Sequence, residues 1–266
     1  MSYRPLLGML AAAASTFAAS AAVASDFVQV VNPDPFTTIV QVNGTPDSDL
    51  ILLESLCDGS VGALRISPWS IRIEVIDASL VASAPIVVFA GGGADLIDTQ
   101  CLDASVVLEV HGEAGADTVY CGPGDDLVFG EDGDDYICGG AGNDTLFGNA
   151  GSRDQLFGND GNDSLSDEDG ATAAKGGEND DSISIVFDPS WDNNSNPFDF
   201  RSSIGKIAGG GGDDYVSIVV LGSPIRFAID GDSGTATPGA ADVLEYTGAA
   251  DTASLYVNFE FTVFIP

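Results

Sequence analysis

Residues 112–166 read GEAGADTVY, CGPGDDLVF, GEDGDDYIC, GGAGNDTLF, GNAGSRDQLF and GNDGNDSLS, six copies of one nine-residue unit of which the fifth has ten residues. A short fixed period indicates a solenoid. In every unit a glycine-rich run ends in an aspartate, and a large apolar residue follows. The aspartates are Asp117, Asp126, Asp135, Asp144, Asp154 and Asp163, and the apolar residues are Val119, Val128, Ile137, Leu146, Leu156 and Leu165. Each unit therefore predicts a turn, a ligand and a short strand.

The residue types in the turn favour calcium. Glycine adopts positive φ at little steric cost, so a GxGxD run lets the backbone curl until its carbonyl oxygens lie beside the carboxylate. Calcium takes roughly six to eight oxygen ligands and tolerates irregular geometry, whereas magnesium demands a tighter octahedron. Soft ligands are scarce, because His111 is the one histidine and the four cysteines are dispersed. Zinc and copper sites are therefore not expected.

The period also predicts how the units stack. Two units make one coil, and neighbouring coils lie about 4.8 Å apart along the hydrogen-bonding direction. Each aspartate should then face its counterpart eighteen or nineteen residues further along the chain. The predicted pairs are Asp117 with Asp135, Asp126 with Asp144, Asp135 with Asp154, Asp144 with Asp163, and Asp163 with Asp181. Alternate turns stack on opposite sides, so two rows of ions are expected.

These units resemble the GGxGxDxUx nonapeptide of RTX, or hemolysin-type, calcium-binding proteins. The resemblance implies an all-β fold, a right-handed parallel β-roll or β-helix solenoid that binds calcium between its coils and folds when it meets calcium outside the cell. It also implies that sixth-position aspartates supply carboxylates and that the glycine loops supply carbonyls. With the outlying echoes AGGGAD (90–95) and GGGGDD (209–214), the predicted metal ligands are Asp95, Asp117, Asp126, Asp135, Asp144, Asp154, Asp163, Asp181, Asp214, Gly115, Gly124, Gly133, Gly142, Gly151 and Gly161.

Three departures from the unit predict weaker sites. The fifth unit has an extra residue, Ser152 or Arg153. The seventh, residues 167–175, has Thr172 where the aspartate belongs and Ala174 at the core position. In the eighth, residues 176–184, Asn179 replaces a glycine; asparagine also visits the left-handed region, so this turn is expected to form nevertheless.

Composition supports calcium and disfavours anionic partners. The chain has 41 acidic and 8 basic residues, a formal net charge of −33, and 18 of the acidic residues fall within 112–184. Nucleic acid and anionic membranes are poor partners for such a field. Without cations the close aspartates repel one another and the glycine loops lose much entropy on ordering. The repeat is therefore predicted to be disordered without calcium.

The N-terminus predicts export. Arg4 precedes the apolar stretch 6–14, and Ala22-Val23-Ala24 offers a small-residue cleavage site, so residues 1–24 have the pattern of a secretory signal peptide. A membrane anchor is the alternative, although the apolar run is short. No later segment is expected to span a bilayer. The predicted location is secreted, extracellular or at the cell surface.

Four cysteines in an exported chain are expected to form disulfides. Cys121 and Cys138 are seventeen residues apart, close to one coil, so the favoured pairs are Cys121 with Cys138 and Cys57 with Cys101. A metal-thiolate site is the alternative.

The remaining sequence alternates strand-like runs with turns. The expected organisation is a signal peptide (1–24), irregular N-terminal β coils or a small β domain (25–85), the calcium-binding β-roll (86–184), an inserted loop (185–203), and C-terminal β coils with a β cap (204–266). The runs before the repeats are 27–31, 37–42, 50–53, 71–76, 86–89 and 106–110. Asn43-Gly44 through Asp49-Leu50-Ile51 has the pattern of a degenerate coil.

Catalytic motifs are absent from the sequence. There is neither HExxH nor GxSxG, and the GDSG at 231–234 has no base other than His111, which is expected to be structural. We therefore expect no enzyme, and predict an exported calcium-binding module of a surface, matrix or adhesion type. An extracellular polysaccharide or a cell surface is the candidate partner. The alternatives are a calcium-dependent polysaccharide lyase-like β-helix, for which Lys175, Arg201, Lys206 and Arg226 are the candidate bases, and a secreted RTX-type toxin or effector component.

Overall fold

The computed structural model describes residues 26–34, 37–151, 153–168, 173–187, 205–225, 227–232, 243–250, 255–257 and 261–265. The predicted signal peptide and residues 188–203 of the predicted inserted loop lie outside the described residues.

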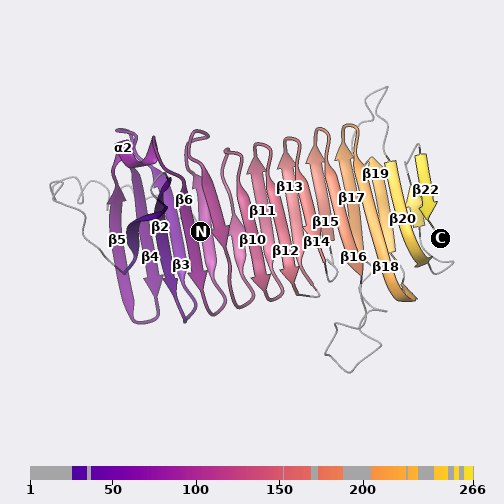
Figure 1. The fold of residues 1–266 in the computed structure, drawn as a ribbon, viewed down its shortest axis with the longest axis horizontal. Helices are drawn as coiled ribbons and strands as arrows, with labels where there is room; N and C mark the ends of the chain where they lie inside the picture. Colours follow the sequence, from indigo (N-terminus) through magenta and orange to yellow (C-terminus); the bar gives the residue numbers. More distant parts are fainter. Residues whose placement is uncertain are drawn as a thin grey trace.

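Two parallel-rich sheets of eleven described strands each lie face to face along an elongated solenoid (Figure 1). In spatial order the first sheet contains β1 (Val28–Asp34), β2 (Thr37–Thr45), β6 (Ile86–Gly91), β8 (Leu108–His111), β10 (Leu127–Asp132), β12 (Thr145–Ala150), β14 (Ser164–Asp167), β16 (Ser182–Phe187), β18 (Tyr215–Ile225), β20 (Val243–Ala250) and β22 (Phe261–Ile265). The second contains β21 (Leu255–Val257), β19 (Phe227–Asp232), β17 (Gly205–Gly211), β15 (Ala173–Glu178), β13 (Gln155–Asp160), β11 (Tyr136–Ala141), β9 (Thr118–Tyr120), β7 (Leu96–Cys101), β3 (Leu50–Ser55), β4 (Val61–Ser67) and β5 (Ser70–Ile76).

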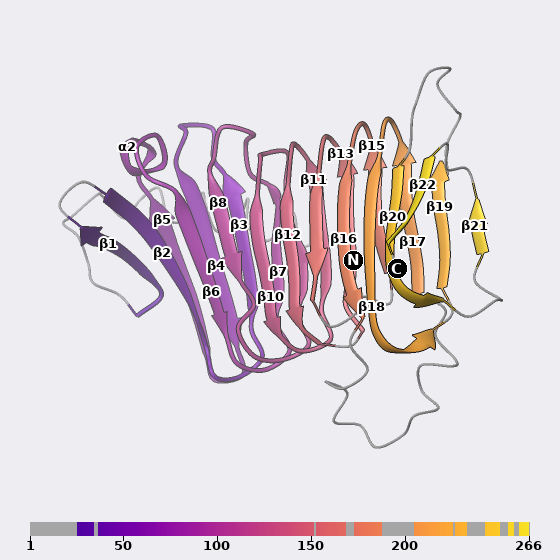
Figure 2. The same ribbon diagram turned by 45° about the vertical axis from the view of Figure 1, so that its right-hand side comes forward.

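Through the repeats, successive strands alternate between the two sheets. Each strand pairs in parallel with the strand one coil earlier and the strand one coil later (Figure 2). Val128 of β10, for example, lies between Val110 of β8 and Leu146 of β12. Two nine-residue units therefore make one coil, and the prediction of an all-β solenoid of the β-roll type is confirmed.

The space between the sheets is filled by one apolar side chain from each unit. Side chains of a strand point alternately to opposite faces, so the residue two positions after the aspartate faces inward. All six predicted core residues, Val119, Val128, Ile137, Leu146, Leu156 and Leu165, are at most 1 % exposed. Ala174 is also fully buried, and its smaller side chain fills the same position in the seventh unit.

Stacked aromatic rings line the outer face of the first sheet. The rings of Phe89, His111, Phe129 and Phe147 follow one another with centroid separations of 4.8, 4.9 and 5.0 Å. The two ring nitrogens of His111 also lie 2.7 and 2.8 Å from carboxylate oxygens of Glu109 and Glu131. His111 is thus a member of a packed outer ladder, in agreement with a structural role.

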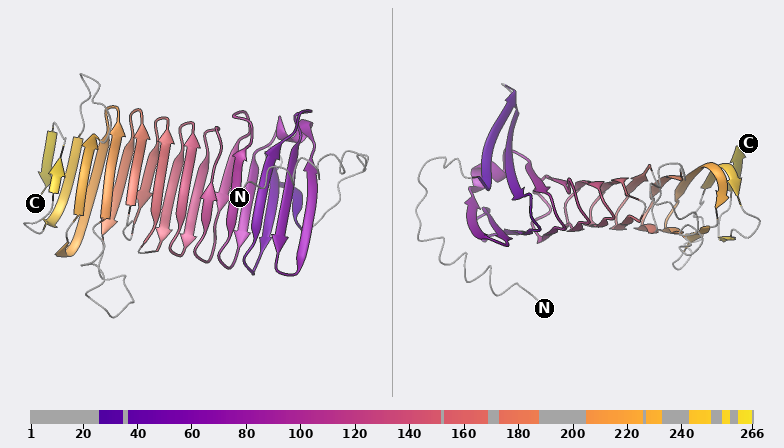
Figure 3. Two further views of the ribbon diagram at one scale, coloured as in Figure 1. Left: turned by 180° about the vertical axis from the view of Figure 1, so that it is seen from behind. Right: turned by 90° about the horizontal axis from the view of Figure 1, so that it is seen from below.

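The N-terminal end departs from the coil pattern. Strand β1 pairs antiparallel with β2, and β3, β4 and β5 form an antiparallel meander. Strands β2 and β3 nevertheless continue the two sheets, because they pair in parallel with β6 and β7 (Figure 3). All six predicted strand runs are found, whereas β4 and β7 were not expected from the sequence.

The one helix of the described residues, α2 (Ala78–Val81), follows β5. Its N-cap is Asp77, whose Oδ1 accepts a hydrogen bond from the Ser79 backbone N–H at 2.8 Å. With four residues it is the longest helix that the described ranges contain, and none of them holds a helix that could cross a membrane.

The predicted disulfides are not supported, because all four cysteines are free thiols. Cys138 pairs with Tyr120, so Cys121 is offset from it by one residue. An offset of one reverses the face on which a strand residue lies. Cys121 is consequently buried between the sheets, whereas Cys138 lies on the outer face, where Asn159 Nδ2 approaches its sulfur at 3.2 Å. Cys57 is exposed in the turn before β4.

Candidate metal centre

The nine predicted aspartates and Asp49 lie in two rows, one along each edge of the solenoid where the chain turns between sheets. Row 1 contains the turns from the first sheet to the second, and row 2 the turns from the second to the first. All ten members are at most 4 % exposed. Row 1 is Asp49, Asp95, Asp117, Asp135 and Asp154, and row 2 is Asp126, Asp144, Asp163, Asp181 and Asp214.

Hydrogen bonds join neighbouring aspartates within each row. The backbone N–H of one aspartate donates to Oδ1 of the aspartate one coil later. All five pairs predicted from the spacing are joined in this way, at 2.7 to 2.9 Å. The same bond joins Asp95 to Asp117 at 2.7 Å and Asp181 to Asp214 at 2.9 Å. The structure therefore brings the predicted aspartates together in the expected order.

A carboxylate oxygen is buried without a hydrogen-bond partner in most of these residues. It is Oδ2 in Asp95, Asp117, Asp126, Asp135, Asp144, Asp163 and Asp181. A buried polar atom left unsatisfied costs about 1–3 kcal/mol, and more when it is charged. Seven such atoms amount to a cost comparable with the whole stability of a typical domain, about 5–15 kcal/mol. A positively charged ligand or protons at these oxygens would remove that cost.

First-position glycines allow the backbone to approach these oxygens closely. At Gly112, the point where a Cβ would stand is 2.7 Å from Asp117 Oδ2 and 2.5 Å from the carbonyl oxygen of Gly130 on the next coil. Equally close approaches to Oδ2 occur at Gly130, Gly139, Gly158 and Gly176. The carboxylate and carbonyl oxygens that meet beside these glycines are of the kind that calcium prefers. The ligand glycines predicted from the sequence are those in fourth position, and the first-position glycines were not among them.

The fourth-position glycines form a spine beneath each row. A Cβ added to Gly115, Gly133 or Gly151 would overlap the carbonyl oxygen of the preceding glycine in row 1. Gly142 and Gly161 stack in the same manner in row 2, after Gly124. Gly133 also has φ +145°, which side chains rarely adopt. In the eighth unit Asn179 replaces this glycine with φ +80°, so the predicted tolerance of asparagine is confirmed.

Burial raises the pKa of the row carboxylates because it disfavours their charged form. The pKa values of Asp95, Asp117 and Asp144 rise to about 7, that of Asp135 to about 6, and those of Asp126 and Asp181 to about 8. Neighbouring aspartates of the same row add repulsion, as Asp144 does at Asp126. In both rows the backbone N–H bonds partly oppose the shift.

Two carboxylates outside the predicted set belong to the same arrangement. Asp49 is 4 % exposed, and its backbone N–H donates to Asp95 Oδ1 at 2.5 Å. Its own Oδ2 accepts from the Thr45 backbone N–H at 2.6 Å, and its Oδ1 is buried without a partner. The signal in the sequence was the degenerate coil from Gly44 to Ile51, which has an aspartate in sixth place.

Asp167 stands where earlier units have a first-position glycine. It is 1 % exposed, and its Oδ2 lies 2.7 Å from the point where a Cβ of Gly148 would stand. Asp154 Oδ2 lies 3.0 Å from that same point. The seventh unit therefore places a carboxylate near row 1 from its first position. Thr172, at the sixth position where other units have the aspartate, lies outside the described residues.

A buried arginine lies at the start of row 1. Nη1 of Arg65 donates to the carbonyl oxygens of Asn43 at 2.6 Å and Gly44 at 3.3 Å. Its guanidinium also lies 5.0 Å from the ring centroid of Phe27, and Nη2 lies 3.9 Å from Asp26. The first loop of the row therefore binds a cation that belongs to the chain.

The donor set fits a hard cation better than a soft one. Within the described residues, no three histidine, cysteine, aspartate or glutamate side chains converge as a metal cluster. An ion in a row would therefore draw on one or two carboxylates together with backbone carbonyl oxygens. That mixture suits calcium, whereas zinc prefers cysteine and histidine in a tetrahedron.

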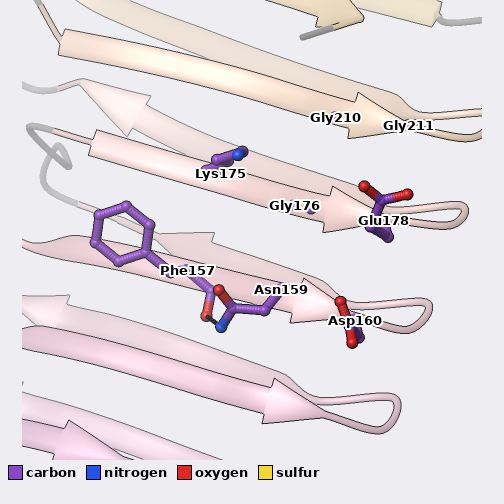
Figure 4. A pocket seen from close by; sticks show the side chains of 9 residues that line it. Phe157, Asn159, Asp160, Lys175, Gly176, Glu178, Gly210 and Gly211 are labelled. Carbon is purple, nitrogen blue, oxygen red and sulfur yellow. Dashed lines mark hydrogen bonds between the residues drawn. The ribbon is translucent and has the colours of Figure 1, made fainter. Parts of the chain in front are cut away.

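A shallow groove lies on the outer face of the second sheet, across β13, β15 and β17 (Figure 4). Its lining includes the ring of Phe157, the ammonium of Lys175 and the carboxylates of Asp160 and Glu178. Among the predicted candidate bases, Lys175 is the one that lines it; Arg201 and Arg226 lie outside the described residues. Among the lining residues Lys175 is the one cation, and Asp160 and Glu178 are acids.

Comparison with known proteins identifies the repeats. Residues 111–146 match the RTX calcium-binding nonapeptide repeat in four copies. No curated protein and no solved structure matches the chain.

Proposed function

We propose, from the four RTX calcium-binding repeats at residues 111–146, that this chain is an exported protein whose β-roll is ordered by calcium and which acts without catalysis as a surface, matrix or adhesion module. The observation that carries the proposal is the pair of buried aspartate rows, in which Oδ2 of seven aspartates and Oδ1 of Asp49 have no hydrogen-bond partner. Proteins with this repeat are typically secreted or extracellular, which supports the proposed location.

Calcium would be held between successive coils of each row. The proposed ligands are the carboxylates of the row aspartates together with carbonyl oxygens of the glycine turns, as at Gly112 and Gly130. The bound ion supplies positive charge to the carboxylates, and it lets the glycine turns close at neutral pH. Because each inner aspartate neighbours two others, adjacent sites share ligands. The row aspartates of the predicted set, Asp95, Asp117, Asp126, Asp135, Asp144, Asp154, Asp163, Asp181 and Asp214, are all included.

An adhesion or matrix role fits the distribution of charge. Calcium bound along the two aspartate rows could bridge the carboxylates of the protein to the acidic groups of a polymer. An extracellular polysaccharide or a cell surface is therefore the proposed partner. The groove at Lys175 offers little support for a lyase, because the one cation that lines it shares the groove with the carboxylates of Asp160 and Glu178.

The test is a calcium titration of the chain without residues 1–24, followed by far-UV circular dichroism and calorimetry at pH 7.5. We expect calcium to convert a largely disordered spectrum into a β spectrum, with several ions bound, and magnesium at equal concentration to have little effect. A β spectrum that is unchanged by calcium, together with no detectable heat of binding, would overturn the proposal. If calcium orders the chain, retention of the protein on polysaccharide or on cells only in the presence of calcium would support the adhesion role.

Row 1 is proposed to extend to Asp49, beyond the matched repeats. Asp49→Asn should lower the number of calcium ions counted by native mass spectrometry by one. The matched control is Asp47→Asn, which makes the same charge change at an exposed position of the same turn. An unchanged ion count in Asp49→Asn would show that the row begins at Asp95, while leaving calcium binding by the repeats intact.

A further inference from the structure

Strand β5 forms one edge of the second sheet, and its outer face is apolar. It pairs with β4 on one side, and no described strand pairs with its other side (Figures 1 and 2). Ile71, Ile73 and Val75 are 66, 40 and 45 % exposed, and Trp69 in the preceding turn is 88 % exposed. Most of the exposed large apolar side chains of the described residues are therefore gathered at this one edge. An exposed apolar edge strand is a template for pairing with another strand.

The apolar face of β5 continues inward across the sheet. Ile71 is paired with Ile66 of β4, which in turn is paired with Leu50 of β3. Ile73 is paired in the same way with Leu64, which lies beside Leu52. These β3 and β4 residues form a second apolar cluster, separate from the core between the sheets. The exposed apolar residues of β5 thus extend this cluster to the edge of the sheet.

We propose that β5 pairs antiparallel with β5 of a second copy of this chain, which joins the two second sheets across a two-fold axis at Ile73. Such an isologous contact places each residue against its symmetric counterpart. Ile73 then faces Ile73 of the partner, and Ile71 faces the partner's Val75. On the opposite face, Arg72 lies against the partner's Glu74, and Glu74 against the partner's Arg72. Apolar residues meet apolar residues, and both charge pairs are complementary.

The charges also select this register over its neighbours. A slip of one residue would reverse the faces of one strand relative to the other. A shift that keeps the faces must move the pairing by two residues, and it then sets Arg72 against Arg72 or Glu74 against Glu74. Like charges directly opposite one another are destabilising in a sheet. The strand is therefore self-complementary in a single register. Arg72 also forms an ion pair with Asp26, with Nη2 and Oδ1 3.5 Å apart. Both side chains are exposed, and exposed ion pairs contribute little to stability, so this pair does not prevent the contact between the two copies.

The test is the molar mass in solution, measured by sedimentation over a range of concentrations in saturating calcium. The wild-type chain should show a concentration-dependent dimer, since a single edge strand buries less than a standard interface. Arg72→Glu and Glu74→Arg should each weaken dimerisation by about tenfold or more, because each turns two attractive pairs into two repulsive ones. The double variant carrying both changes restores two opposite-charge pairs and should dimerise as the wild type does.

The control is Val107→Lys, which adds charge at an exposed apolar residue away from β5 and should leave the molar mass unchanged. A monomeric wild-type chain at every concentration would overturn the proposal. So would a dimer that both single variants leave intact, or a double variant as weak as either single one. Because calcium is saturating and circular dichroism verifies the fold of each variant, these outcomes do not depend on the proposed calcium sites.

Discussion

Protons should replace calcium in ordering the repeats, because both neutralise the same buried carboxylates. In the folded chain the pKa of Asp117 is about 7, whereas the ordinary value is 3.8. A shift of this size favours the protonated form of the folded chain by roughly 4 kcal/mol. A raised folded pKa gives stability that is fully present below pH 3.8 and is lost as the pH rises through the folded value. For the row aspartates that window reaches from 3.8 to about 8.

The magnitude makes the effect visible. Between pH 8.5 and pH 5, Asp117 alone should regain roughly 2–3 kcal/mol of stability. Asp144 has the same pKa, and Asp126 a higher one, so a few residues together match the whole stability of a typical domain, about 5–15 kcal/mol. The pH of 5 stays above the isoelectric point of about 4.1, so the chain keeps a net negative charge.

The assay is far-UV circular dichroism in EGTA at pH 8.5 and at pH 5. We expect a largely disordered spectrum at the higher pH and a β spectrum at the lower one. In saturating calcium the spectrum should be β at both pH values. The calcium affinity measured by calorimetry should fall as the pH drops below about 7, because protons compete with the ion for the same carboxylates. The same EGTA spectrum at both pH values would refute the link between the buried carboxylates and folding.

Three further outcomes follow from the described geometry. Asp144→Asn should remove one or two bound calcium ions in native mass spectrometry, because Asp144 belongs to two adjacent pairs. Asp134→Asn, the same charge change at an exposed residue, should remove none. Equal losses in the two variants would contradict the pairing. Gly133→Ala should lower the free energy of unfolding in calcium by about 3 kcal/mol or more in a urea titration, since its φ is +145° and an added Cβ meets backbone; a loss below about 1 kcal/mol would refute the stacked spine. Thiol labelling in calcium should modify the exposed Cys57 and spare the buried Cys121, with four thiols reacting once the chain is denatured without reductant; fewer than four would reveal a disulfide.

The repeats could be predicted from the sequence because local and long-range patterns agree there. The nine-residue period sets the position of each turn, and two periods make one coil of eighteen residues. The pairing of Asp126 with Asp144 therefore followed from their separation of eighteen residues. The inward position of Leu146 followed from strand alternation. The count also explains the wrong disulfide. Seventeen residues separate Cys121 from Cys138, one fewer than the coil, and one residue in a strand reverses the face.

The N-terminal end could not be predicted to the same depth. Strand β4 carries VGALRIS, in which buried residues run consecutively and Arg65 is among them, so no two-residue alternation marks it. Its antiparallel pairing with β3 and β5 depends on partners far from the repeats. Asp49 was missed for a similar reason, since forty-six residues separate it from Asp95. The first-position glycines were missed because their role is to allow a close approach of carboxylate and backbone, which only the packed neighbours reveal.

Arg65 gives the folding reaction a direction. A guanidinium stays charged at any physiological pH and cannot diffuse away, so the carbonyl groups of Asn43 and Gly44 have their cation before calcium is encountered. The coils beside it can therefore serve as a template on which the first calcium-dependent coil is laid down, and growth should proceed toward the C-terminus. Hydrogen exchange pulsed after rapid mixing with calcium should protect β8 before β16. Simultaneous protection of both strands would mean that the template does not act.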